Sequence, residues 1–100
     1  MIPENEQKEH PGKEKNRISI TIRHGGQTVE LEFNIHQKIK KVLDDTLKEF
    51  KDRYGLQPPP NNVPFLRYGN IDLAELDKSL KDYGIPDKAV LDLLFQYRGG

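Results

Sequence analysis

The sequence predicts an α+β domain in which a mixed sheet of four to five strands wraps around one long helix. Three observations lead to this prediction. Residues 18–33 alternate apolar and polar side chains on both sides of a Gly-Gly turn, which is typical of a hairpin buried on one face. Residues 35–54 repeat apolar side chains at helical spacing, and residues 90–97 form an apolar run typical of a strand.

The composition excludes several classes of function. Lys plus Arg number 16 and Asp plus Glu also number 16, so no net basic field attracts nucleic acid or anionic lipid, and we expect neither nucleic acid nor membrane as a partner. No secretory signal is visible, and we expect a cytoplasmic protein. Without cysteine, and with three histidines that lack metal-ligand spacing, the chain is expected to hold no metal and no cofactor of its own. No motif assembles a nucleophile, a base and an orienting group, so we expect no enzyme.

Residues 1–17 are expected to form a flexible charged arm. The segment mixes Glu and Lys with Pro3, Pro11 and Gly12, and it has no large apolar residue after Ile2. Such a segment buries too little surface to offset the entropy lost on ordering. The predicted domain therefore spans residues 18–97.

The first part of that domain is predicted to be a hairpin followed by a helix. Strands are expected at 18–22 and 29–33, and Gly25-Gly26 is a turn, because no Lys-Ser or Lys-Thr follows it as in a phosphate-binding loop. Asn34 and Gln37 have the spacing of a capping box, which predicts a helix of about five turns that ends at Gly55. Opposite charges three or four residues apart predict that its other face is solvated.

A proline-rich connection separates the helix from three further extended segments. Strands are expected at 63–68, 71–73 and 90–97, with Leu91 and Leu93 facing inward and Asp92 and Leu94 facing outward. Between them, an irregular segment is expected to contact the core through three apolar residues, Leu76, Leu80 and Ile85.

The last residues printed are Arg98-Gly99-Gly100, which directly follow the last predicted strand and include two residues without side chains. Two glycines can pass through a narrow channel and present a carboxylate to an enzyme, which suggests a reactive terminus that needs no trimming. The alternative is simple fraying at the end of a domain.

The pattern Leu80-x-Asp82-Tyr83-x-Ile85, followed by a strand and Arg-Gly-Gly, resembles the end of ubiquitin. The predicted order of elements over residues 18–100 is similar to the ubiquitin β-grasp fold. Within that superfamily the chain most resembles the small bacterial ubiquitin-like proteins that accompany activating, conjugating and deconjugating enzymes.

This resemblance implies a protein modifier, expected to be a monomer. A partner activating enzyme would use ATP and Mg²⁺ to adenylate the Gly100 carboxylate, which would then pass to a partner cysteine as a thioester and finally to an amine of a target protein. The implied partners are this enzyme, a conjugating enzyme, a deconjugating protease and the targets.

Residue by residue, the resemblance is incomplete. Arg98, Gly99 and Gly100 match the ubiquitin tail, whereas Gln96 stands where ubiquitin has an arginine read by its activating enzyme, which implies a dedicated enzyme. Leu66, Asp92 and Leu94 match a surface patch of isoleucine, histidine and valine through which ubiquitin binds partners. Asp92 would place an anion in that patch and disfavour acidic partners. Two alternatives stay open: a sulfur carrier that forms a C-terminal thiocarboxylate, and a non-covalent β-grasp interaction module.

Overall fold

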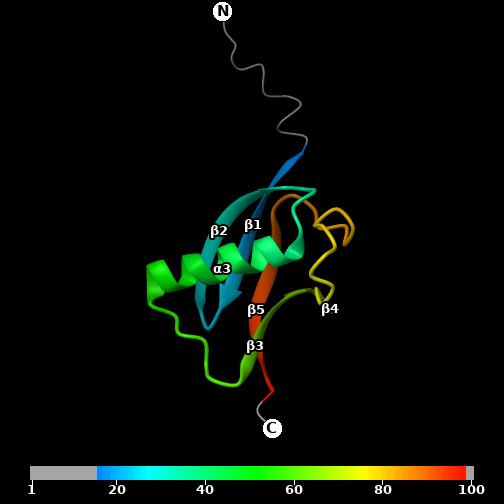
Figure 1. The fold of residues 1–100 in the computed structure, drawn as a ribbon. Helices are drawn as coiled ribbons and strands as arrows, with labels where there is room; N and C mark the ends of the chain where they lie inside the picture. The colour runs from blue at the N-terminus through cyan, green and yellow to red at the C-terminus, as the bar shows by residue number, and fades with distance from the viewer. Residues whose placement is uncertain (1–15, 99–100) are drawn as a thin grey trace, which may run out of the picture.

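The computed structural model describes residues 16–98 and shows a five-stranded mixed sheet with one helix on one face (Figure 1). The sheet order is β2-β1-β5-β3-β4, with β5 parallel to β1 and antiparallel to β3. The elements are β1 (Arg17–His24), β2 (Gln27–Asn34), α3 (Ile39–Tyr54), β3 (Asn62–Tyr68), β4 (Ile71–Asp72) and β5 (Ala89–Tyr97). The predicted α+β class, with a mixed sheet wrapped on a helix, is confirmed.

The hairpin of β1 and β2 follows the predicted alternation. Ile20 lies opposite Leu31 in the ladder, and the isoleucines of β1 are buried on the helix side. Gly25 and Gly26 make the turn with positive φ angles of 55° and 83°, which favour glycine. β1 starts earlier than predicted: Arg17 pairs with Asn34, so Arg17 belongs to the domain and not to the arm. Residues 1–15 of the expected arm lie outside the described residues.

The helix begins four residues later than the predicted start at Ile35, and the predicted capping box does not form. The Asn34 side chain instead accepts a hydrogen bond from the N–H of His36, 2.8 Å away. At the true start, the N–H groups of Ile39 and Lys40 donate to the carbonyls of Lys78 and Leu76. These carbonyls come from a segment almost forty positions away, so local sequence could not reveal them. Here tertiary contacts replace a side-chain cap.

The helix ends where the sequence predicted. Gly55 is the C-cap with a left-handed φ of 70°, and its N–H bonds to the Lys51 carbonyl. The exposed face carries ion pairs four residues apart: Lys41 with Asp45, Lys48 with Asp52, and Arg53 with Glu49. The predicted solvated face is confirmed.

The core lies between the helix and the inner face of the sheet, and residues from every part of the described chain contribute to it. Its largest fully buried side chains are Phe50, Ile20, Ile22, Ile39, Leu66, Leu73, Leu80, Leu91, Leu93 and Val42. Leu80 and Ile85 bury as predicted, but Leu76 remains 39% exposed. Leu76 contributes its backbone instead, as the carbonyl that caps α3. No described helix is long and apolar enough to cross a membrane.

Candidate functional site

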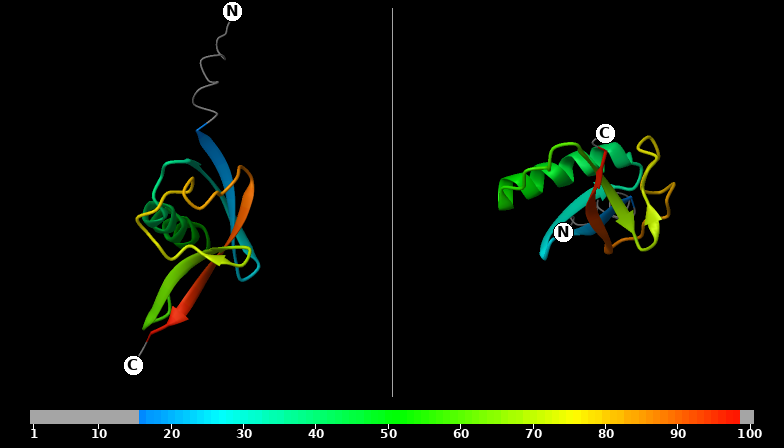
Figure 2. Two further views of the ribbon diagram at one scale, coloured as in Figure 1. Left: turned by 90° about the vertical axis from the view of Figure 1, so that its right-hand side faces the viewer. Right: turned by 90° about the horizontal axis from the view of Figure 1, so that it is seen from below.

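The end of β5 projects from the sheet together with the start of β3. β1 pairs with β5 only as far as Asp92, whereas β3 continues to pair with β5 as far as Tyr97. The two strands therefore leave the sheet as a ribbon, on the opposite side of the domain from the start of β1 (Figure 2). The ribbon closes where the N–H of Arg98 donates to the carbonyl of Asn61 over 2.6 Å. The fold thus holds the backbone up to Arg98.

The side chains at this end are open to solvent. Gln96 and Arg98 are both exposed, and a guanidinium nitrogen of Arg98 lies 3.4 Å from the Gln96 side-chain oxygen. Tyr97 between them is 68% exposed. The two residues predicted for recognition by an activating enzyme therefore share one accessible surface. Gly99 and Gly100 lie outside the described residues.

Leu66 does not belong to the surface, and its predicted place in a docking patch is wrong. It is fully buried, and it lies opposite Leu93, which faces the helix. Residues directly opposite in an antiparallel ladder share a face of the sheet, so the outward positions of β3 are Phe65 and Arg67. Asp92 and Leu94 are half-buried on the outer face, as predicted. Arg67 lies opposite Asp92, and Phe65 lies opposite Leu94.

A row of alternating charges crosses the outer face of four strands. Arg23 on β1 makes two hydrogen bonds to Asp92 on β5, of 3.0 and 3.2 Å. Arg67 on β3 contacts Asp72 on β4 at 2.6 Å. The hydrogen bond and the charge of Asp72, with a further contribution from Asp92, raise the pKa of Arg67 above its already high usual value. The row places two cations and two anions in alternation, so their charges cancel.

Four apolar side chains flank this row and form what we call the outer patch: Val63, Phe65, Val90 and Leu94. Val63 and Val90 are 45% and 40% exposed, and Phe65 and Leu94 are half-buried. The Arg67 guanidinium lies 5.7 Å from the centre of the Phe65 ring. The sequence patterns did not single out Phe65 and Arg67 as surface residues. Successive side chains of a strand point to opposite faces, so an inward Leu66 would have placed both of its neighbours on the outer face.

A shallow groove of about 160 Å³ borders the ribbon on the β4 side. Val63, Phe65 and Leu76 are among its apolar lining residues, and Gln96 and Arg98 also line it. The groove therefore joins the outer patch to the base of the tail.

His24 has a structural role at the β1–β2 turn. Its Nδ1 lies 2.9 Å from the Leu93 carbonyl, and its ring packs edge-on against Phe95 and Phe50. Within residues 16–98, no three His, Cys, Asp or Glu side chains are grouped so that they could hold a metal ion.

Comparison of the coordinates with solved structures identifies the fold. The ubiquitin-like domain of an Arabidopsis thaliana protein matches with a TM-score of 0.61 and 18% identity, over 81% of this chain and 79% of that one. A designed protein based on ubiquitin matches with a TM-score of 0.63 and 22% identity, over 84% of this chain and 94% of the design. This chain therefore has a ubiquitin-like β-grasp fold.

The same fold also forms part of a larger assembly. A chain of the ESX-5 inner membrane complex matches with a TM-score of 0.73 and 14% identity, over 85% of this chain but only 22% of that one. No protein-family model matches the sequence, and no curated protein matches it. At these identities the comparisons define the fold alone.

Proposed function

We propose that the protein is a ubiquitin-like modifier that is joined to target proteins through the carboxylate of Gly100. The observation that carries this proposal is the ribbon of β3 and β5, which projects from the domain and ends at Arg98, immediately before two glycines. Glycines lack the Cβ atom that would widen the chain, so they suit a narrow enzyme channel. The folded domain itself gives partner proteins a rigid surface on which to dock.

The chemistry would be carried out by partner enzymes. A carboxylate oxygen of Gly100 attacks the α-phosphorus of ATP on an activating enzyme, and pyrophosphate leaves, with Mg²⁺ neutralising the phosphate charge. A partner cysteine thiolate then displaces AMP and forms a thioester. A target amine finally displaces the thiolate, loses a proton and forms an amide bond. This chain contributes the carboxylate and the surfaces that position it.

The exposed residues at the base of the tail would determine which activating enzyme binds. Gln96 and Arg98 share one face of the ribbon, and together they present one amide and one cation. A neutral Gln96 gives no ion pair to an acidic pocket, which favours an activating enzyme dedicated to this chain. A conjugating enzyme, a deconjugating protease and cytoplasmic target proteins complete the set of partners, and the modifier acts as a monomer. We also propose that this chain is one of the small bacterial ubiquitin-like proteins that act together with such enzymes.

The outer patch favours a second candidate, a non-covalent interaction module. Val63, Phe65 and Leu94 give a small apolar surface beside a charge row that has no net charge. A partner of the module would bind here without needing the tail. In the modifier, the same patch would serve to dock conjugating enzymes or receptors.

The test is expression of the full chain in its native host with its neighbouring genes, followed by intact mass analysis and gel electrophoresis. A variant without Gly99 and Gly100 is compared with Gly100→Ala, which keeps a carboxylate but adds a methyl group. Adducts that depend on the tail, and that leave a Gly-Gly remnant on a target lysine after trypsin cuts at Arg98, are the expected result. A tail-dependent exchange of oxygen for sulfur, without adducts, would replace the proposal with the sulfur carrier. No covalent change in any variant would leave the non-covalent module.

A further inference from the structure

A groove between the second half of α3 and the loop that follows it is a feature that the proposed function does not use. We call it the helix groove. It has a volume of about 370 Å³, and it is lined by Leu47, Lys48, Lys51, Leu56 and Pro58. Three of these residues are apolar, two are lysines and none is acidic. The helix groove thus combines an apolar surface with two positive charges.

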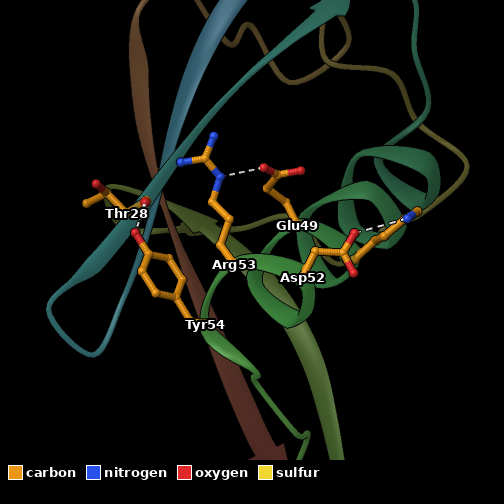
Figure 3. Close-up of polar contacts among 6 residues, drawn as sticks. Thr28, Glu49, Asp52, Arg53 and Tyr54 are labelled. Carbon is orange, nitrogen blue, oxygen red and sulfur yellow. Dashed lines mark hydrogen bonds and ion pairs between the residues drawn. The ribbon is translucent and has the colours of Figure 1, made fainter.

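The helix groove lies on the opposite side of α3 from the Glu49–Arg53 ion pair. That pair joins two consecutive turns of the helix over 2.6 Å (Figure 3). Residues two positions apart on an α-helix are rotated by about 200°, so Leu47 points nearly opposite to Glu49, and Lys51 nearly opposite to Arg53. The loop after the helix runs on the side of α3 where the ribbon of β3 and β5 projects (Figure 1). The helix groove therefore opens at this end of the domain.

Backbone hydrogen bonds and proline hold the loop side of the helix groove in place. The N–H of Gly55 donates to the Lys51 carbonyl over 2.9 Å, and the N–H of Leu56 donates to the Phe50 carbonyl over 3.3 Å. Leu56 is half-buried and packs against the core. Pro58 begins a run of three prolines, whose rings fix φ and restrict the backbone. Because the groove is formed before a ligand enters, binding orders little of this chain.

The charge of the two lysines is compensated only in part within the domain. Lys48 makes a 3.1 Å ion pair with Asp52, four residues further along α3. Lys51 forms no ion pair with the part of the chain that the structure describes. Both lysines are exposed, so their ammonium groups are open to a ligand. An anionic ligand therefore meets at least one free cation here.

We propose that the helix groove binds an acidic segment of a partner protein through an apolar anchor. The anchor enters between Leu47, Leu56 and Pro58, which removes apolar surface from water. Glutamate or aspartate residues on both sides of the anchor pair with Lys48 and Lys51. The apolar contact supplies affinity, whereas opposite charge selects the partner and speeds its association.

A second copy of this chain fits the helix groove less well than a free segment does. The chain exposes a leucine between two acidic residues, in Glu75-Leu76-Asp77. The Leu76 carbonyl, however, accepts a hydrogen bond from the N–H of Lys40, and the Leu76 side chain lines the shallow groove beside the ribbon. Leu76 is therefore held on its own domain, whereas a free segment can place its anchor fully in the helix groove.

The test titrates the ¹⁵N-labelled full chain with an end-capped hexapeptide that has two leucines between two pairs of glutamates. We expect saturable shifts of the backbone amide signals of Leu47, Lys51 and Leu56. A hexapeptide with serines in place of the leucines lacks the anchor and should bind at least about tenfold more weakly. A hexapeptide with lysines in place of the glutamates should also bind at least about tenfold more weakly, because it meets two cations.

Matched variants separate the charge of the helix groove from general electrostatics. Lys48→Gln with Lys51→Gln should weaken binding of the glutamate and leucine peptide by about tenfold at low salt, and this difference should shrink as salt rises. The control, Lys78→Gln with Lys81→Gln, removes the same net charge at exposed positions that do not line the groove and should keep the original affinity. Each double variant also loses one ion pair, so the two are matched in that respect.

A second pair of variants tests the apolar contact. Leu47→Ala removes part of the surface that receives the anchor, and it should weaken binding of the same peptide. Leu31→Ala is the control, because Leu31 is also half-buried and packed against the core but does not line the helix groove. Circular dichroism checks that all four variants are folded.

The proposal is overturned if the three peptides bind equally, if the two members of a variant pair behave alike, or if no saturable shift appears in the millimolar range. Shifts of the groove signals that depend on protein concentration without peptide would replace the partner with a second copy. Tighter peptide binding after removal of residues 1–15 would assign the groove to that segment, where Ile2 stands near Glu4 and Glu6. Removal of Gly99 and Gly100 should leave peptide binding unchanged, so this proposal and the modifier function fail independently.

Discussion

Arg67 and Asp92 lie directly opposite each other in the ladder of β3 and β5, and each makes its closest ion pair with a strand on its other side. Arg67 contacts Asp72 on β4, and Asp92 contacts Arg23 on β1. The result is a continuous row of alternating charge across four strands. On this face the row separates Val90 from Phe65 and Leu94, so the outer patch combines apolar contacts with balanced charges.

Removal of the Asp92 charge should change the electrostatics of the outer face, whereas the free energy of unfolding of the domain should change little. Asp92→Asn leaves Arg23 and Arg67 without their shared anion, so the charge row gains a net positive charge. We expect longer retention on a heparin column at low salt, and loss of that difference at high salt because the charges are exposed. The unfolding midpoint in urea should move little, since exposed ion pairs contribute about 0–1 kcal/mol. Asp44→Asn is the control with equal net charge, and equal retention of the two variants would contradict the prediction.

Leu66 and Leu94 should respond very differently to truncation. Leu66→Ala removes a fully buried side chain and leaves a cavity, so it should lower the free energy of unfolding by about 2–5 kcal/mol. Leu94→Ala removes a half-buried side chain on the outer face and should cost less than half as much. Urea denaturation of both variants measures the difference. Equal losses would show that Leu66 does not have the core position described above.

Tyr54→Phe tests the contact between the helix end and the edge strand. The variant loses the hydroxyl that donates to the Thr28 carbonyl and keeps the ring that packs against Phe50. Because the bond is exposed, we expect a loss of only about 0.5 kcal/mol in the free energy of unfolding. Urea denaturation measures this loss, and a loss as large as that expected for truncation of a buried side chain would contradict the prediction.

Asp82 should contribute stability that depends on pH. The N–H of Ser79 donates to its carboxylate at 3.0 Å, and this bond, with the Ser79 hydroxyl and the charges of Lys78 and His36, lowers the pKa of Asp82 in the folded chain. The unfolded chain binds the proton more readily, so the contribution is complete above the ordinary aspartate pKa of about 3.9 and disappears as the pH falls through the lower folded value.

Asp82→Asn should therefore unfold at a lower urea concentration than the parent chain at neutral pH. The two midpoints should begin to approach each other below about pH 4 and should converge only below the lowered pKa of Asp82 in the folded chain, where the parent carboxylate also becomes neutral. Asp77→Asn, at an exposed position nearby, is the control for the loss of one carboxylate from this part of the chain. A midpoint difference for Asp82→Asn that stays constant from neutral to acidic pH would assign the effect to geometry and not to charge.

Several elements could be predicted from local sequence because local forces decide them. The alternation of Ile18, Ile20 and Ile22 has only one arrangement that buries all three, so the inner face of β1 follows from the period of two. Gly55 ends the helix because glycine adopts the left-handed conformation at little cost. Leu91 and Leu93 face inward, and Asp92 outward, for the same reason as in β1.

Other features depended on segments that meet only in the folded chain. The start of α3 is decided by carbonyls of Leu76 and Lys78, which satisfy N–H groups that a local cap would otherwise serve. The inward position of Leu66 comes from its pairing with Leu93, whereas the short apolar run of β3 left two registers open, and a shift of one residue exchanges the two faces.

The fold class and the order of the elements thus follow from local patterns in the sequence. Contacts between distant segments set which side chains form the outer patch and where α3 begins. The physical reason is that hydrophobic periodicity specifies one face of each strand, whereas the neighbours of a strand are set by long-range hydrogen bonds between residues as distant as Arg23 and Asp92.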